Sequence, residues 1–265
     1  MSTAKKYPQF LLFGDSITQY SSNLRDGFSF GAALAEHCER RLDIVNRGLS
    51  GYNTANALKI IEDIIPSTEN AQVDYLLVAF GANDAALPGT TGQHVPLDEY
   101  KKNIEAIINH PRVKAHNPKI LLVTPPPIDE PVCEEGDKAR GYAEVTRRQT
   151  VTFKYAEAIR TIGAEAKEKE QNVFVVDLWW AMMNEAIKRT LDRPADASPE
   201  YLLGTLESGK SDGFRELLVD GLHFTGAGYV VFYEELVHYV GKGWKSEPID
   251  NPRWVFPHWS IAPKI

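Results

Sequence analysis

The chain has 265 residues, of which 43% are hydrophobic and 25% are charged, and its formal net charge is −7. These proportions are those of a globular protein, and the length fits one large α/β domain. An acidic chain without a long run of lysine or arginine lacks the electrostatic footprint of a nucleic-acid-binding protein, so we expect no nucleic-acid partner.

The sequence also contains little that suggests a membrane. No apolar run approaches the roughly 18 residues of a membrane-spanning helix, so we expect no membrane insertion. The opening stretch MSTAKKYPQF has two lysines but no apolar segment after them, which argues against a secretory signal. Cys38 and Cys133 are far apart and without a metal-like spacing, which favours free thiols in a reducing compartment. We therefore expect a cytoplasmic protein.

Short apolar runs alternate with amphipathic stretches along the chain. Strands are predicted at residues 10–13, 43–46, 75–80, 120–124 and 173–177. Helices are predicted at residues 29–41, 54–65, 97–109, 145–169, 179–191 and 227–240. Alternating strands and helices favour a parallel sheet with helices on both faces. Because no linker or repeat divides the chain, we assign residues 1–243 to a single domain.

Three segments fall outside this alternation. Residues 125–144 are interpreted as a proline-rich acidic loop, and residues 192–213 are polar and interrupted by proline and glycine. Residues 244–265 contain three tryptophans and four prolines, which is too aromatic for a disordered end. We predict that this tail lies extended on the domain or on a partner subunit, and the second arrangement would make the protein a homodimer.

Four short sequence motifs with polar residues lie where they could meet at one edge of the sheet. FLLFGDSIT carries Ser16 to the end of the first strand, NRGLSGYNT places Gly51 after the second, and FGANDA places Asn83 after the third. DGLHFTGAGY brings Asp220 and His223 to the start of the last helix. In open α/β sheets, ligands bind beyond the carboxyl ends of the strands. These side chains are therefore expected to converge on one cleft.

The residue types at this edge suit acyl transfer. A serine hydroxyl needs an adjacent base, and His223 is such a base, oriented by Asp220. The backbone N–H groups of Ser16 and Gly51 and the amide of Asn83 would stabilise an oxyanion. Each residue also has a plain structural interpretation: a helix cap for Ser16 or Asp220, a turn residue for Gly51 or Asn83, and a core histidine for His223.

The motifs Gly14-Asp15-Ser16, Gly51, Gly81-x-Asn83-Asp84 and Asp220-x-x-His223 resemble blocks I, II, III and V of the SGNH, or GDSL-type, hydrolases. This resemblance implies a flavodoxin-like three-layer α/β/α sandwich with a five-stranded parallel sheet. It also implies a catalytic triad of Ser16, Asp220 and His223, with an oxyanion hole formed by Ser16, Gly51 and Asn83, and no metal or organic cofactor. We interpret the acidic neighbours Asp15 and Asp84 as carboxylates that hydrogen-bond nearby backbone N–H groups.

The sequences in and around the motifs also resemble the isoamyl acetate-hydrolysing esterase branch of this family, notably RGLSGYNTANALKI and DGLHFTGAGYVVFYEEL. That resemblance implies hydrolysis of short-chain esters, acetates above all, with a small ester as the substrate. The alternatives on the same fold are a sugar O-acetylesterase, a thioesterase or a lysophospholipase. An alternative of another class is a non-catalytic interaction protein that uses the tryptophans of the tail.

A second serine motif competes with Ser16. Residues 209–213, GKSDG, match the Gly-x-Ser-x-Gly pattern of a nucleophile elbow. That elbow follows a buried strand, whereas the preceding LLGTLES ends in polar residues. We therefore reject Ser211 as a nucleophile.

Overall fold

The structure is a computed structural model that describes residues 7–190, 203–208, 211–244, 247 and 254–262. Its centre is a five-stranded sheet in which every neighbouring pair is parallel. The strands are β1 (Gln9–Gly14), β2 (Asp43–Gly48), β3 (Val73–Ala79), β4 (Lys119–Val123) and β5 (Val173–Val176). Their spatial order, β2-β1-β3-β4-β5, is that of the flavodoxin-like doubly wound sheet. The predicted three-layer α/β/α sandwich is thereby confirmed.

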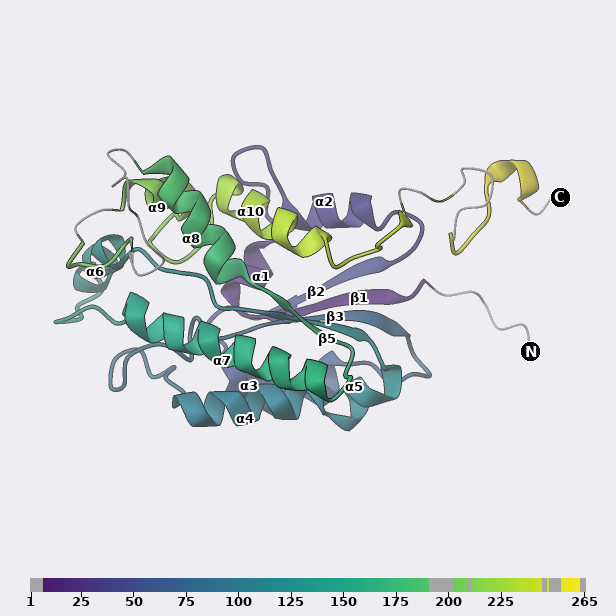
Figure 1. Cartoon of the computed structure of the whole chain (residues 1–265), viewed down its shortest axis with the longest axis horizontal. Coiled ribbons are helices and arrows are strands. Elements are labelled where there is room, and N and C mark those ends of the chain that lie inside the picture. Colours follow the sequence, from purple (N-terminus) through teal and green to yellow (C-terminus); the bar gives the residue numbers. More distant parts are fainter. Residues whose placement is uncertain (1–6, 191–202, 209–210, 245–246, 248–253, 263–265) are drawn as a thin grey trace.

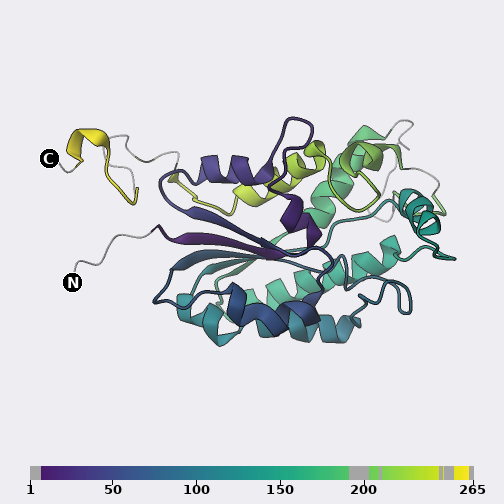
Figure 2. The same cartoon turned by 180° about the vertical axis from the view of Figure 1, so that it is seen from behind.

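Helices cover both faces of the sheet (Figures 1 and 2). One layer contains α2 (Phe30–His37), α8 (Leu178–Arg189), α9 (Asp212–Leu217) and α10 (Gly226–Val237). The other contains α3 (Thr54–Ile64), α4 (Leu97–Ile108), α5 (Pro111–His116) and α7 (Gln149–Glu168). The short helix α1 (Ser16–Tyr20) follows β1 directly.

The strands divide their side chains between two hydrophobic clusters. Phe10 and Leu12 of β1 join the cluster under α8 and α10, whereas Leu11 and Phe13 join the cluster under α3, α4 and α7. This alternation follows from the two-residue period of a strand. Since both faces are covered, β1 is apolar from Phe10 to Phe13, which appears in the sequence as a continuous hydrophobic run.

The interpretation of residues 125–144 as a loop is wrong in part, because α6 spans Glu130–Ala139. Proline 131 lies in the first helical turn, where its missing N–H costs nothing. The buried face of α6 is formed by Glu130, Cys133 and Asp137. These residues recur at helical spacing, but two of them are acidic, so the stretch lacks the apolar periodicity that announces a helix. The helix predicted at 145–169 also begins later, at Gln149.

The described residues of the tail contact the chain itself. The guanidinium of Arg40 lies 3.9 Å from the ring centre of Trp254 and donates a hydrogen bond to the carbonyl of Pro257 over 2.8 Å. The short 3-10 helix η2 (Trp259–Ile261) lies at the end of the molecule where β1 begins (Figure 1). The domain boundary after residue 243 and any contact with a partner subunit stay predictions.

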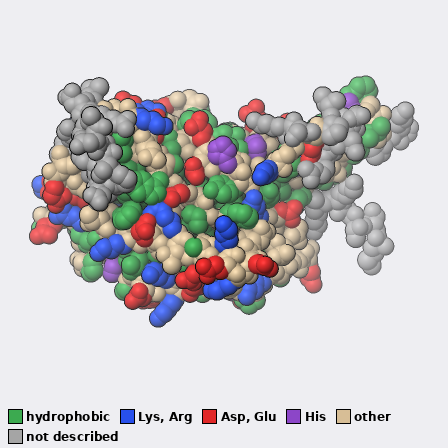
Figure 3. Space-filling view, in the orientation of Figure 1, with side chains coloured by type: hydrophobic (Ala, Val, Ile, Leu, Met, Phe, Trp, Pro, Cys, Tyr) green, Lys and Arg blue, Asp and Glu red, His purple; other side chains and the backbone are tan. Residues whose placement is uncertain are grey.

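The surface carries both signs of charge. On the face shown in Figure 3, acidic and basic side chains of the described residues are interspersed. Among the helices of the described ranges, none is long and apolar enough to cross a membrane.

Candidate active site

Ser16 is the first residue of α1, immediately beyond the carboxyl end of β1. The preceding Asp15 caps the helix, because its Oδ1 accepts a hydrogen bond from the N–H of Ile17 over 2.9 Å. Ser16 is 5% exposed, so its hydroxyl is held at the edge of the sheet with little access for water. The interpretation of Ser16 as the capping residue is therefore wrong, since Asp15 takes that position.

Asp220 and His223 lie in a tight turn before α10. The Nδ1 atom of His223 is 2.8 Å from Oδ2 of Asp220, and Oδ1 of Asp220 accepts hydrogen bonds from the backbone N–H groups of Leu222 and His223. Gly221 has a φ of 82°, a left-handed conformation that glycine adopts without strain. Asp220 does not cap α10, because Thr225 does so with its side chain.

The two residues form a hydrogen-bonded chain with Ser16. Nε2 of His223 is 2.8 Å from Oγ of Ser16. An ionised carboxylate only accepts hydrogen bonds, so Nδ1 carries the proton and Nε2 is left to accept from the serine hydroxyl. Burial raises the pKa of Asp220, but the hydrogen bonds from His223 and the backbone outweigh this and lower the pKa overall. Asp220 is therefore ionised at neutral pH, as the orienting group of a triad must be.

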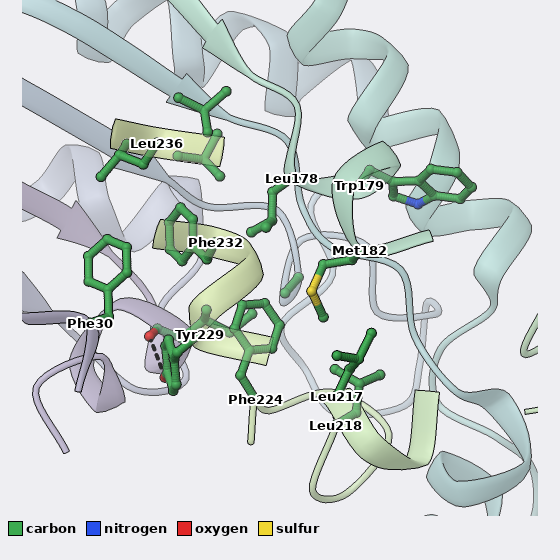
Figure 4. Close-up of a cluster of buried hydrophobic side chains, with 14 of the residues drawn as sticks. Phe30, Leu178, Trp179, Met182, Leu217, Leu218, Phe224, Tyr229, Phe232 and Leu236 are labelled. Atoms are coloured by element: carbon green, nitrogen blue, oxygen red, sulfur yellow. Dashed lines mark hydrogen bonds between the residues drawn. The ribbon is translucent and has the colours of Figure 1, made fainter. Parts of the chain in front are cut away.

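A buried aromatic anchor fixes the position of His223. Its neighbour Phe224 is fully buried and lies against Tyr229 of α10 (Figure 4). The two ring centres are 5.2 Å apart. The hydroxyl of Tyr229 donates to the carbonyl of Ile17 in α1 over 2.8 Å. This contact ties the helix that follows the histidine to the helix that carries the serine. Ser16 and His223 are 207 residues apart in the sequence, and these buried contacts hold them side by side.

Gly51 and Asn83 follow β2 and β3, as predicted. Gly51 has a φ of 82°, and Asn83 is 4% exposed. Nδ2 of Asn83 donates to the carbonyl of Tyr52 over 2.9 Å, which links the two loops. The candidate oxyanion residues therefore lie together with the serine and the histidine along one cavity of about 410 Å³.

Two residues of this cavity are absent from the sequence-based set. Arg147 is 8% exposed and donates to Oδ1 of Asn83 over 3.1 Å, and Gln93 donates to the carbonyl of Gly51 over 2.9 Å. Further around the cavity lie Asp137, at the end of α6, and Arg140, which follows it. An Nη of Arg140 is 2.6 Å from Oδ1 of Asp137. Neither Gln93 nor Arg147 belongs to a motif, so only the tertiary structure reveals them.

Two buried carboxyl groups lie behind the site. Burial raises the pKa of Asp15 to about 7, and the nearby charge of Asp84 adds to this, while the hydrogen bond from Ile17 opposes it. Burial likewise raises the pKa of Asp84 to about 6, against hydrogen bonds from Thr54. Asp84 accepts from the N–H of Thr54 over 2.9 Å and so satisfies the start of α3. Both acids bond backbone N–H groups, as the sequence analysis predicts.

The described parts of the chain contain no group of three or more histidine, cysteine, aspartate or glutamate side chains that could hold a metal ion. The side chains that converge at the carboxyl edge of the sheet thus offer a nucleophile, a base and hydrogen-bond donors. These are the parts that acyl transfer requires.

Known proteins of similar sequence point to the same chemistry. A model of the family described as GDSL-like lipase/acylhydrolase matches residues 10–236. The chain is 33% identical over 261 residues to a GDSL esterase/lipase of Arabidopsis thaliana, covering 96% of this chain and 93% of that protein. It is 29% identical over 262 residues to the isoamyl acetate-hydrolyzing esterase of Saccharomyces cerevisiae, covering 96% and 94%.

The fold is similar to the crystal structure of the lipase/acylhydrolase from Enterococcus faecalis, with a TM-score of 0.57, 24% identity, and 88% and 95% of the two chains covered. The chain belongs to the GDSL-like lipase/acylhydrolase family, also called the SGNH hydrolases. Within that family it is an ester hydrolase.

Proposed function

We propose that the protein hydrolyses short-chain esters of alcohols, acetates above all, through an acyl-enzyme formed on Ser16. The observation that carries this proposal is the hydrogen-bonded chain from Ser16 through His223 to Asp220 at one cavity with Gly51 and Asn83. A helix cap or a core histidine would not need a serine hydroxyl 2.8 Å from an imidazole nitrogen whose other nitrogen faces a carboxylate.

In the first half of the reaction, Oγ of Ser16 attacks the acyl carbon while Nε2 of His223 takes the hydroxyl proton. The tetrahedral intermediate carries its negative charge on the former carbonyl oxygen. The backbone N–H groups of Ser16 and Gly51 and the Nδ2 of Asn83 donate to that oxygen. When the carbon–oxygen bond to the alcohol breaks, His223 returns the proton to the departing alcohol.

In the second half, a water molecule takes the place of the alcohol. His223 removes a proton from this water as it attacks the acyl-enzyme, and a second tetrahedral intermediate forms. Its collapse breaks the bond to Ser16, which recovers its proton from His223 and releases the carboxylic acid. Asp220 keeps its charge throughout and stabilises the imidazolium that forms in each half.

The test is the intact mass of the protein after brief exposure to a fluorophosphonate, which displaces fluoride on an activated serine. We expect one adduct on the wild type and none on Ser16→Ala, which should also lose hydrolysis of p-nitrophenyl acetate. Ser211→Ala is the matched control, because Ser211 is the rival serine of the Gly-x-Ser-x-Gly pattern. This control should keep both the adduct and the activity. A folded wild type without an adduct would overturn the proposal.

The acyl and alcohol parts of the substrate are proposed on separate grounds. The acetyl group is supported by the relative in Saccharomyces cerevisiae, which is named for isoamyl acetate hydrolysis and matches over nearly the whole chain. A series of p-nitrophenyl esters from acetate to palmitate tests this. A fall of kcat/KM with chain length is expected, whereas a maximum at long chains would favour a lysophospholipase.

One observation favours a second candidate, a sugar O-acetylesterase. Beyond the triad, the cavity is lined by hydrogen-bonding side chains, among them Gln93, Asp137 and Arg140. Such a lining suits an alcohol with several hydroxyl groups. Comparing kcat/KM for isoamyl acetate and for a mono-acetylated sugar separates the two candidates, because the transferred acetyl group is the same in both.

A further inference from the structure

Arg147 joins three parts of the chain from a buried position. Its Nε donates to the carbonyl of Ala82 over 3.0 Å, and one Nη donates to Oδ1 of Asn83 over 3.1 Å and to Oε1 of Gln93 over 3.3 Å. These acceptors lie in the loops that follow β3, whereas Arg147 itself lies just before α7. All three acceptors are neutral oxygens, so these hydrogen bonds hold the guanidinium without a carboxylate partner.

The contact with Asn83 decides which way its amide points. An amide has an oxygen that accepts and an NH₂ group that donates, and only the NH₂ end can stabilise an oxyanion. Arginine can only donate, so it holds the oxygen, while the carbonyl of Tyr52 can only accept, so it holds one N–H of Nδ2. Because Arg147 and the carbonyl of Tyr52 fix the plane of the amide, they also fix the direction in which the second N–H of Nδ2 points.

The contact with Gln93 extends the same control to Gly51. Oε1 of Gln93 accepts from Arg147, and its Nε2 donates to the carbonyl of Gly51 over 2.9 Å. The backbone of Gln93 is itself held by Asn53, whose Nδ2 donates to the Gln93 carbonyl over 2.8 Å. One guanidinium therefore fixes Asn83 directly and the Gly51 turn through a single side chain.

We propose that Arg147 is the positioning residue of the oxyanion hole, which it organises by fixing the amide of Asn83 and, through Gln93, the turn of Gly51. This inference rests on the proposed function, because it assumes that Asn83 and Gly51 donate to the oxyanion. Arg147 acts through these two residues and need not touch the ester. Preorganised donors of this kind act on the transition state more than on the bound substrate, so kcat should respond more strongly than KM.

The experiment compares Arg147→Met with the wild type on p-nitrophenyl acetate. We expect kcat to fall by about 10²-fold, the size typical for loss of one oxyanion donor, while KM changes by less than about threefold. Arg148→Met is the matched control: it removes the adjacent guanidinium, which pairs with Glu130. A rise in KM with unchanged kcat in Arg147→Met would overturn the inference, because it would mean that Arg147 binds substrate.

A double-mutant cycle separates positioning from a general structural role. If Arg147 acts through Asn83, then adding Arg147→Met to Asn83→Ala should cost much less than it costs in the wild type. Additive losses would overturn the inference. Should Arg147→Met not fold, Gln93→Ala breaks only the link to Gly51, and kcat should then fall by about 10-fold with KM nearly unchanged. An unchanged kcat in Gln93→Ala would also count against the inference.

The failure of this inference can be told from failure of the proposed function. If the wild type hydrolyses the ester and Ser16 takes the fluorophosphonate, the proposed function holds, and kcat of the Arg147 and Gln93 variants then decides the present inference alone. If the wild type neither hydrolyses the ester nor labels, the proposed function fails first.

Discussion

Asp220 and His223 expose 49% and 25% of their side chains, whereas Asn83 and Arg147, which line the same cavity, are only 4% and 8% exposed. We call Ser16, His223 and Asp220 the proton-transfer group, and Gly51, Asn83, Gln93 and Arg147 the oxyanion group. In the first group, water reaches the side chains of Asp220 and His223, although not the buried Ser16, and can replace some of their interactions. In the second group, the hydrogen bonds of Arg147 to Ala82 and to Asn83 are buried, so the amide of Asn83 is fixed before the substrate arrives.

This difference predicts an order of sensitivity within the site. Loss of His223, the proposed base, should be most harmful, because its Nε2 is hydrogen-bonded to the hydroxyl of Ser16. Loss of a buried oxyanion donor should come next. Loss of the half-exposed Asp220 should cost less than in enzymes that bury this residue.

The largest effect is expected for His223→Ala. Removing the proposed base should lower kcat on p-nitrophenyl acetate by at least about 10³-fold, as it does in enzymes with a Ser-His-Asp triad. His238→Ala is the control, because His238 is exposed and follows the last turn of α10. If His223→Ala kept more than a tenth of the activity, the proton-transfer group would not be the source of catalysis.

The next effect is expected for Asn83→Ala. Without Nδ2 of Asn83, the proposed oxyanion hole has two donors instead of three, and kcat should fall by about 10²- to 10³-fold with little change in KM. Steady-state kinetics on the same ester measure both constants. A change in KM alone would place Asn83 among the residues that bind substrate and would remove the distinction between the two groups.

A smaller effect is expected for Asp220→Ala. The carboxylate orients His223 and stabilises its charged form, but solvent around the half-exposed Asp220 can supply part of this stabilisation. We expect kcat to fall by about 10- to 10²-fold, less than for Asn83→Ala. The decisive result is the ratio of kcat for Asp220→Ala to kcat for Asn83→Ala, measured on the same ester. A loss for Asp220→Ala equal to that for Asn83→Ala would show that exposure does not set the order.

The sheet and the proton-transfer group are recoverable from the sequence for a clear physical reason. Buried parallel strands are continuous apolar runs. Ser16 opens the helix after β1, and Asp220 and His223 lie in the turn before α10, so the composition around each is constrained locally by a strand end or a helix start. The oxyanion group is recoverable only in part. Gly51 and Asn83 belong to motifs, whereas Arg147 stands beside Arg148 in the stretch TRRQT. Nothing in two adjacent arginines shows which one points into the core.

The sequence pattern does not reveal the helix α6, for a related reason. Its buried face carries Glu130 and Asp137, whose partners lie outside the helix: Oε1 of Glu130 accepts from the N–H of Gln149, and Oδ2 of Asp137 accepts from the N–H of Thr146. A helix packed through polar contacts has no apolar stripe. Sequence patterns detect burial of hydrocarbon, and they do not detect burial of hydrogen-bonded charge.

The smallest effect concerns stability and contrasts Asp15 with Asp220. Asp220 has a lowered pKa because its charge is paired, whereas Asp15 has a pKa raised to about 7 because its charge would be buried. The unfolded chain ionises Asp15 at an ordinary pKa, so the folded state binds the extra proton between pH 4 and 7. The stability that Asp15 contributes is therefore complete below about pH 4 and is lost as the pH rises through about 7.

Asp15→Asn tests this contrast, because an amide keeps an oxygen to accept from Ile17 but has no charge to bury. Between pH 6 and pH 8, the wild type should lose about 1 kcal/mol of unfolding free energy relative to Asp15→Asn, which corresponds to a relative shift in Tm of about 2–4 °C. Thermal melts at both pH values measure it. Asp43→Asn, which removes an exposed carboxylate from β2, controls for the change in net charge. Equal shifts in both variants would show that burial of Asp15 is not the cause, and that the charge behind Ser16 is tolerated as well as one at the surface.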